Sequence, residues 1–388
     1  MVSASLPLEG IRVLDLTRLL PGSVCTLMLV DLGAEVTKIE DPQGGDYARW
    51  FRPRLDGQSV FFRMNNRGKR SAVINLKDTR GQQVLHRLVK DADVLVEGFR
   101  PGVTERIGAD YETLRKLNPK LVYCSMSGYG ADGPQAQVSG HDLNYVSQAG
   151  LIGATAQPQV PGGQFADIGG AYAAVAAITA ALFRRERDEQ KRGAYIDISF
   201  TEAALPFALY AWTEAAFGQT GPGQLSGGLA CYSVYRCADG QYVALAALEE
   251  KFWKNFCTAI ERPDLIDVYQ TPDMQTYLKK ELQGLFGQRD SATWDALLGS
   301  ADCCFSQVAA PGTIHDDPQL KARGALGRFD DGTTWLRSPL RITDHTPEIT
   351  NQIPDYGQHT REVLLAAGYS DAELDSLAAA GVVRLAVQ

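Results

Sequence analysis

The sequence predicts an α/β fold with a mostly parallel, doubly wound sheet, followed by a smaller α+β domain. Three observations lead to this prediction. The first third of the chain alternates short strand-like runs with segments of helical periodicity, which is typical of parallel strands joined by helices. After Phe200 this alternation ends and a hairpin pattern follows. The length of 388 residues also favours two domains over one simple core.

The elements of the first part follow one another in a regular order. Short apolar or alternating runs are separated by segments with apolar residues at helical spacing, and Asp110 is expected to cap one of the helices. Ligands of such sheets bind beyond the carboxyl ends of the strands, so the loops after the strands are candidate sites. The predicted strands are 11–17, 34–40, 71–76, 93–99 and 121–130, and the predicted helices are 22–33, 79–92 and 111–118.

The second part of the chain has a different pattern. An apolar segment over 201–218 predicts a helix, and a turn-rich stretch follows it. Residues 231–248 predict a β-hairpin in which Asp239 and Gly240 form the turn. Further helices are predicted at 251–260 and 295–299, and two short ones at 359–383. We therefore expect a large domain over 1–198, a linker over 199–222, a small α+β domain over 223–325 and a C-terminal segment over 326–388.

Composition and short motifs exclude several classes of protein. The net charge of −8 argues against a nucleic-acid partner, and the missing GxGxxG motif disfavours a dinucleotide cofactor. The longest apolar stretch, 171–183, suits a buried helix better than a membrane span, and no signal peptide is recognised. The seven cysteines show no metal-binding spacing, so we expect reduced thiols, no metal site and a cytoplasmic location.

Three side chains are candidates for acid–base chemistry. Asp167 precedes an apolar helix expected over 168–183, so it either caps that helix or lies beside backbone N–H groups that would stabilise an oxyanion. His141 lies in SGHDLNY and is either a general base or a hydrogen-bonded loop residue. Glu249 ends the hairpin run and is either a site residue or a solvated strand end.

Several stretches in this order resemble the family III CoA-transferase/α-methylacyl-CoA racemase family (CaiB/BaiF-like). They include PLEGIRVLDLTRLLPG, DLGAEVTKIEDPQGGD, NRGKRSAVINLK, ADVLVEGFRPGVTERIG and LNPKLVYCSMSGYGADGP. The resemblance implies an interlocked homodimer, in which a Rossmann-like large domain and a small domain are joined by linkers and the C-terminal tail returns to the large domain. It also implies an acyl-CoA thioester substrate, with no redox or metal cofactor.

The resemblance assigns coenzyme A contacts to positions in the first half of the chain. One departure is Asp41, because some members of the family carry an arginine after the sequence KIE. Two basic runs, 65–71 and 98–108, are consistent with phosphate binding, although such short runs are usually solvated loops. The implied contacts are Leu19, Leu20, Lys69, Arg106, Gly128 and Tyr129.

The family divides into two chemistries, and the resemblance implies one of them for this chain. Transferases use the aspartate at the position of Asp167 as a nucleophile that forms an aspartyl intermediate. Racemases use the same aspartate as an acid–base group, paired with the histidine of a GHD motif and followed by a glutamate in the small domain. His141, Asp167 and Glu249 match the racemase set, so we expect a 2-methylacyl-CoA racemase or epimerase, with a CoA-transferase as the alternative.

Overall fold

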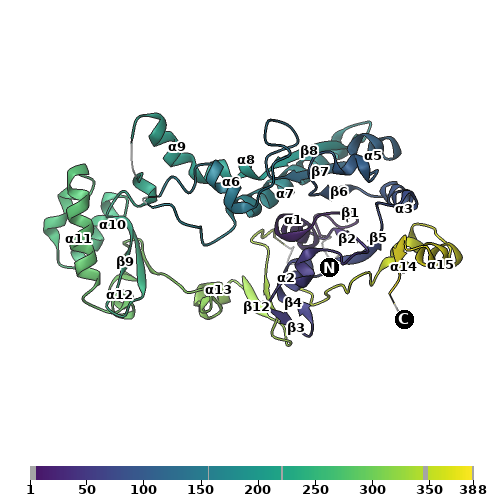
Figure 1. Cartoon of the computed structure of the whole chain (residues 1–388). Helices are drawn as coiled ribbons and strands as arrows, with labels where there is room; N and C mark the ends of the chain where they lie inside the picture. The colour runs from purple at the N-terminus through teal and green to yellow at the C-terminus, as the bar shows by residue number, and fades with distance from the viewer. Residues whose placement is uncertain (1–5, 156, 220–221, 344–347, 387–388) are drawn as a thin grey trace. The chain divides into compact units, whose positions relative to one another are not determined.

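The computed structural model describes residues 6–155, 157–219, 222–343 and 348–386 (Figure 1). Residues 220 and 221 of the predicted linker lie outside the described residues.

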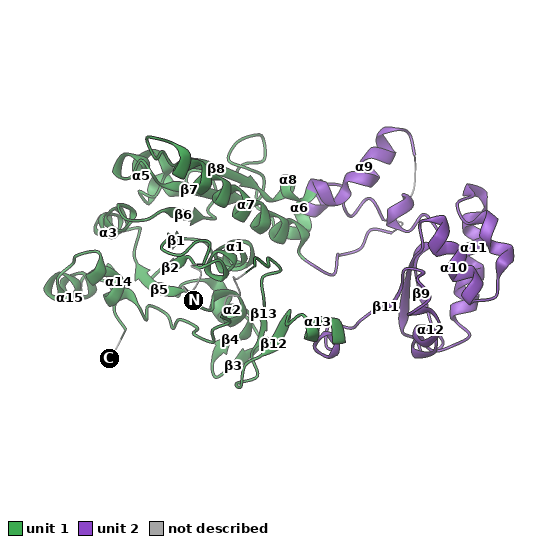
Figure 2. Ribbon diagram, turned by 180° about the vertical axis from the view of Figure 1, so that it is seen from behind, with its two compact units in different colours: residues 1–145, 164–204, 318–388 green, residues 146–163, 205–317 purple. Residues whose placement is uncertain are grey.

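The chain divides into two compact units (Figure 2). Residues 146–163 belong to unit 2, whereas the sequence analysis placed them in the large domain. The predicted domain limits therefore stay predictions. Unit 1 comprises residues 1–145, 164–204 and 318–388, and unit 2 comprises residues 146–163 and 205–317.

Unit 1 is built on a seven-stranded sheet with the order β14–β5–β2–β1–β6–β7–β8. All neighbouring strands pair in parallel except β14, which comes from the C-terminal tail and pairs antiparallel with β5. The predicted α/β class with a mostly parallel sheet is therefore confirmed. The strands are β1 (Arg12–Asp15), β2 (Glu35–Glu40), β5 (Arg70–Ile74), β6 (Val94–Glu97), β7 (Val122–Ser127), β8 (Ala194–Ser199) and β14 (Val383–Arg384).

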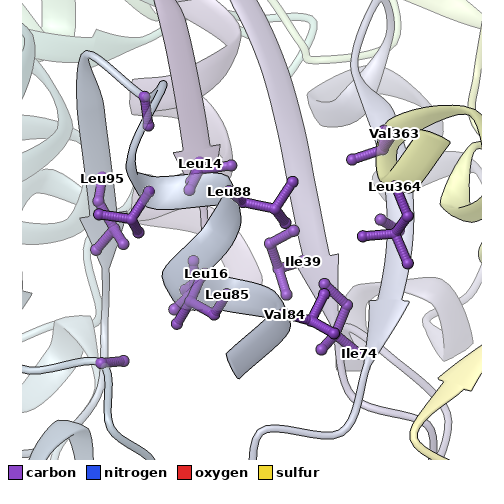
Figure 3. Close-up of a cluster of buried hydrophobic side chains, with 14 of the residues drawn as sticks. Leu14, Leu16, Ile39, Ile74, Val84, Leu85, Leu88, Leu95, Val363 and Leu364 are labelled. Carbon is purple, nitrogen blue, oxygen red and sulfur yellow. The ribbon is translucent and has the colours of Figure 1, made fainter. Parts of the chain in front are cut away.

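Helices cover both faces of this sheet because successive strand side chains point to opposite faces. On one face, buried side chains of the strands pack against α3 and α14 (Figure 3), and the same cluster includes residues of α5 and α15. On the other face, α1 and α7 pack against each other and against the central strands. The helices of unit 1 include α1 (Leu19–Asp31), α2 (Val60–Asn66), α3 (Thr79–Val89), α4 (Val103–Arg106), α5 (Tyr111–Leu117), α7 (Phe165–Arg187), α8 (Phe200–Ala204), α13 (Pro318–Ala322), α14 (Thr360–Ala366) and α15 (Asp371–Ala379).

Two helices of unit 1 can be compared with the ends predicted from the sequence. Asp110 accepts a hydrogen bond from the N–H of Thr113 at 2.9 Å, so it caps α5 as predicted. Helix α7 is longer than the predicted 168–183, because it begins at Phe165 and ends at Arg187. By length and composition alone, α7 could cross a membrane, a property that buried core helices share. Here α7 packs against α1, β7 and β8.

Unit 2 contains a three-stranded antiparallel sheet with its own apolar core. The predicted hairpin is present as β9 (Tyr232–Arg236) and β10 (Tyr242–Ala246), and a third strand, β11 (Phe305–Gln307), adds to it. In the turn, Gly240 has a φ of 79°, a conformation that glycine adopts without strain. The helices of unit 2 that pack on this sheet are α10 (Glu250–Ala259), α11 (Gln275–Phe286) and α12 (Ser291–Leu298).

The segment predicted as one helix over 201–218 is interrupted. It continues from α8 into a 3-10 turn over Leu205–Ala208 and then into α9 (Leu209–Ala216). The interruption lies at Pro206, which has no N–H to donate and disfavours the α conformation of the residue before it. The remaining short strands are β3 (Arg54–Leu55), β4 (Gln58–Ser59), β12 (Leu326–Arg328) and β13 (Thr334–Leu336), and helix α6 spans Asp142–Gln148.

Candidate active site

The start of helix α7 is held by a carboxylate from another part of the chain. The Asp142 Oδ1 atom accepts hydrogen bonds from the N–H groups of Ala166, at 2.8 Å, and Asp167, at 3.0 Å. Asp167 lies in the first turn of α7 and is not its N-cap, which is Gln164, so of the two roles considered for Asp167 the capping role is wrong. Because a carboxylate is stabilised at a helix N-terminus, Asp142 clamps the start of α6 to the start of α7.

The same contacts correct the expected oxyanion site at the start of this helix. The N–H groups of Ala166 and Asp167 are already bonded to Asp142, and the N–H of Ile168 donates to the carbonyl oxygen of Gln164 at 3.1 Å. In this structure these three donors therefore hold the helix itself, and they are not available to an enolate oxygen.

His141 immediately precedes the clamping residue and is exposed. Its N–H donates to the Asn144 side chain at 3.1 Å, and its carbonyl oxygen accepts from the N–H of Asn144 at 2.8 Å. These contacts fix the backbone of His141 at the start of α6. Since the neighbouring Asp142 accepts a hydrogen bond from the N–H of Asp167, the backbones of His141 and Asp167 lie in one corner of unit 1.

Two ionisable groups in this corner have perturbed acidity. Burial, together with the nearby Asp142 carboxylate, raises the pKa of Asp167 to about 7. Burial, together with the Asp167 carboxylate, raises the pKa of Tyr145 to about 12. A carboxyl group that titrates near neutral pH can both accept and donate a proton, which suits acid–base catalysis.

The side chains of Tyr129 and Tyr145 and the backbone of Gly128 form a wall beside Asp142. The Tyr145 hydroxyl donates to the carbonyl oxygen of Gly140 at 2.5 Å, and the Tyr145 ring meets that of Tyr129 edge-on at 5.2 Å. A Cβ atom on Gly128 would lie 2.5 Å from the Tyr145 ring, so only glycine fits there. Gly128 and Tyr129, two of the expected coenzyme A contacts, are therefore part of this corner.

Glu249 lies in the other unit. It is exposed and occupies the N-cap position of α10, where its carbonyl oxygen accepts from the N–H groups of Phe252 and Trp253. Its side chain makes no capping hydrogen bond. Its predicted role beside His141 stays a prediction, because the two residues belong to separate units.

A second feature of unit 1 is a cavity of about 350 Å³ at the carboxyl ends of four strands. Leu16, Ile39, Ile74 and Phe99, which end or follow β1, β2, β5 and β6, contribute to its walls. The chain runs outward from β1 to β2 and β5 on one side and from β6 to β7 on the other. The cavity thus lies at the topological switch point, where ligands of such sheets bind.

The remaining expected coenzyme A contacts lie around the loops at this end of the sheet. Leu19 and Leu20 are half-buried at the start of α1, and Leu19 has a φ of 64°, which is unusual for a residue other than glycine. Arg106 is exposed at the end of α4, beside the cavity residue Ile107. These positions agree with a ligand that binds along the carboxyl ends of the strands.

Lys69 differs from what was expected. Its side chain is fully buried, and its ammonium group contacts the Thr26 hydroxyl at 2.7 Å, Asn66 Oδ1 at 2.9 Å and Asp15 at 3.4 Å. Burial lowers the pKa of Lys69 to about 8. In this structure the Lys69 ammonium group is therefore bound inside the protein, where it also contacts the carbonyl oxygen of Ser23 in α1 at 3.1 Å, and it does not face the cavity. Among the described residues, no group of three His, Cys, Asp or Glu side chains could hold a metal ion.

The sequence matches the profile of CoA-transferase family III over residues 8–360. The chain belongs to this family. It is 32% identical to the human alpha-methylacyl-CoA racemase over 95% of the chain and 96% of that protein. It is also 32% identical to the acetyl-CoA:oxalate CoA-transferase of Acetobacter aceti over 87% of the chain and 90% of that protein.

Solved structures of the family share the fold. A CAIB/BAIF family protein from Brucella suis superposes with a TM-score of 0.82 at 28% identity, and the match covers 94% of this chain and all of that chain. The chain is an enzyme of this family, since its relatives along nearly the whole length are enzymes. Both racemases and CoA-transferases are among them, so membership alone is consistent with either activity.

Two residues of this corner were not identified from the sequence. Asp142 and Tyr145 both lie in the stretch GHDLNY, where their residue types alone indicate no role in the acid–base site. An aspartate in the first turn of a short helix gives a local signal of helix stabilisation only. Its contact with Asp167 joins residues 25 positions apart, which no local pattern reveals.

Proposed function

We propose that this member of CoA-transferase family III is an acyl-CoA racemase or epimerase that acts on 2-methylacyl-CoA thioesters. The observation that supports the proposal is the clamp formed by Asp142, which bonds to the N–H of Asp167 and is the chain neighbour of His141. The raised pKa of Asp167, near 7 because of burial and the Asp142 carboxylate, supports a role in carrying protons.

The reaction moves one proton off the α-carbon and one proton back. The thioester carbonyl acidifies the α-carbon, and one of the two groups removes its proton to leave an enolate. The conjugate acid on the opposite face then protonates the same carbon, which inverts the configuration and leaves the thioester bond intact. We assign the two roles to His141 and Asp167. The step is a proton transfer only, so it requires no metal or redox cofactor, and coenzyme A enters as part of the substrate.

We further propose that the chain works as an interlocked homodimer in the cytoplasm, with Glu249 orienting His141 from either the same or the partner chain. Apolar side chains along α9 support the dimer, because Leu209, Tyr210 and Trp212 are between 53% and 68% exposed. Contiguous exposed apolar surface of this kind usually marks an interface. All seven cysteines are free thiols, which agrees with a reducing compartment.

The experiment compares two activities of the same variant. Wild type and His141→Ala are incubated with a single enantiomer of a 2-methylacyl-CoA in deuterated water, and Cα deuterium, inversion and CoA transfer to a free acid are measured. Inversion in the variant should fall by about 10²- to 10⁴-fold, the usual contribution of a general acid or base. The fold should survive, because His141 is exposed.

A matched control is His86→Ala. His86 lies in helix α3, where its ring Nε2 contacts the carbonyl oxygen of Gly108 at 2.7 Å, so it is a histidine outside the candidate site. This variant should retain inversion. Wild-type inversion in His141→Ala would contradict the proposal. CoA transfer by the wild type without any Cα deuterium would instead assign the CoA-transferase activity, with Asp167 as the nucleophile.

A further inference from the structure

Arg18 is the most conspicuous cation in the wall of the cavity at the switch point. Its guanidinium group lies over the Tyr47 ring at 5.2 Å and near the Phe99 ring at 5.8 Å, and it donates to the Tyr47 hydroxyl at 3.1 Å. All three residues line the cavity. About one third of the Arg18 side chain remains exposed. The group is thus held between two rings and still open toward the cavity.

We propose that Arg18 binds the phosphates of the acyl-CoA substrate and that Asp41 is the counter-ion which these phosphates replace. The proposal deepens the proposed function, because it takes coenzyme A as the ligand of this cavity. It adds a residue that the expected coenzyme A contacts did not include. The argument rests on the charges around the cavity and on the way in which the backbone holds Arg18.

The charges in the cavity wall leave Arg18 loosely paired. The Asp41 carboxylate is shared by two cations, because one oxygen lies 3.8 Å from Arg18 and 3.6 Å from Lys77. These separations exceed the 2.7–2.9 Å of tight charge-assisted hydrogen bonds, roughly by one ångström. The other carboxylate in the wall, Glu40, is bonded to Arg49 at 2.7 and 2.8 Å and so does not neutralise the two cations.

Two cations that share one carboxylate form a site with an excess of positive charge. A phosphate oxygen can accept hydrogen bonds from the planar guanidinium group in a bidentate arrangement, which a carboxylate at 3.8 Å does not achieve. The apolar walls next to these cations, Leu16, Ile39, Ile74 and Leu76, suit a flat heterocyclic base. A nucleotide therefore matches both parts of the cavity, because its base fits the apolar walls and its phosphates fit the two cations.

A buried ion pair fixes the backbone on both sides of Arg18. The Lys38 ammonium group donates to the carbonyl oxygen of Thr17 at 2.8 Å and pairs with Asp46 at 2.9 Å. The other Asp46 oxygen accepts from the N–H of Leu19 at 3.0 Å. Both ion-pair partners are fully buried. Strained backbone persists only where its surroundings over-determine it, and here the pair keeps Leu19 at a φ of 64°. Lys38 and Asp46 are therefore positioning residues for Arg18.

The test measures equilibrium binding to the full-length protein, with coenzyme A and pantetheine as the two probes. Pantetheine has the thiol arm without the nucleotide, so it does not reach the phosphate site. Arg18→Gln should weaken coenzyme A binding by about 10-fold, the loss expected for one charge-assisted contact, and leave pantetheine binding unchanged. The matched control is Arg80→Gln, which breaks an exposed pair with Asp78 at the start of α3. It should bind both probes normally.

Asp41→Asn gives a result of opposite sign. Without its competing carboxylate, the site should bind coenzyme A more tightly, and the gain should shrink when Arg18 is already glutamine. Asp46→Asn should weaken coenzyme A binding without affecting pantetheine. Its control is Asp31→Asn, which breaks another buried ion pair, with Arg67 at 2.7 Å, away from this loop.

Several outcomes would overturn the inference. Wild-type coenzyme A affinity in Arg18→Gln removes Arg18 from the site, and an equal gain from Asp41→Asn in both backgrounds removes the exchange of counter-ions. Asp31→Asn and Asp46→Asn could instead lose the same amount of coenzyme A affinity. The Lys38–Asp46 pair would then support the fold in general and would not position Arg18. These are binding measurements, so absence of racemase activity would refute only the proposed function. Failure of the wild type to bind coenzyme A would refute both.

Discussion

The Asp167 carboxyl group should destabilise the folded chain once it is ionised, and Asp167→Asn removes this cost. Burial, with a smaller contribution from the Asp142 carboxylate, raises the pKa of Asp167 to about 7 from an ordinary value of 3.8. The difference of about 3 pH units corresponds to roughly 4 kcal/mol in the free energy of unfolding. Because the side chain is only partly shielded from solvent, we expect about 2–4 kcal/mol.

The sign follows from the two states of the proton. Below pH 3.8 the carboxyl group is protonated in both the folded and the unfolded chain. As the pH rises to about 7, the unfolded chain releases this proton while the folded chain keeps it, so stability falls, and above pH 7 the loss is complete. An asparagine side chain carries no such proton, so Asp167→Asn should match the wild type near pH 4 and exceed its stability at pH 8, while losing activity.

The assay is urea unfolding of both proteins at several pH values between 4 and 8. The control is Asp188→Asn at the other end of α7, because Arg192 holds the pKa of Asp188 well below its usual range. That variant should lose stability at pH 8, since an ionised partner is removed. Equal or lower stability of Asp167→Asn at pH 8, or a gain that does not vary with pH, would refute the reasoning.

Three further predictions concern the clamp, the wall and the assembly. Asp142→Asn retains an oxygen acceptor for the N–H groups of α7 but removes the negative charge, so the pKa of Asp167 should fall below about 7. The limb of the pH profile of kcat/KM that reports Asp167 should then move to lower pH, and an unmoved limb would contradict this prediction. Gly128→Ala places a Cβ atom 2.5 Å from the Tyr145 ring and should lower kcat/KM by about 10- to 100-fold. Wild-type kinetics would show that the Tyr145 ring moves aside without loss of activity, which contradicts the prediction. Sedimentation at micromolar concentration should give a dimer, and an active monomer would refute the proposed assembly.

Most of the sheet was predictable because its signals are local. Strand-like runs and helical periodicity alternate through the first third of the chain, and Asp110 stands one residue before a helix that it indeed caps. The hairpin of unit 2 was predictable for the same reason, since Asp239 and Gly240 form its turn. The helix predicted over 201–218 was wrong although a local signal existed, because Pro206 interrupts it.

The candidate site was predictable only in its parts. His141 and Asp167 were recognised through a family resemblance, and the structure brings them to one corner. Their connection through Asp142 depends on a contact between two helix starts that lie far apart in the sequence. The acidity of Asp167 likewise depends on burial, which follows from how α7 packs against α1 and the sheet. A residue type predicts an ordinary pKa, and only its surroundings shift that value.

The sequence by itself determined five strands of the large sheet, the family and the acid–base candidates, because periodicity, capping and motifs act over a few residues. It did not identify β8 and β14. The tertiary structure decided which charges face the cavity. Lys69 precedes β5 and Arg18 follows β1, and both are basic residues next to a strand of the large sheet. Contacts with α1 nevertheless bury the Lys69 ammonium group, whereas the Lys38–Asp46 pair directs Arg18 to the cavity. Burial and long-range ion pairing are properties of packed elements, so they cannot be read from a run of basic residues.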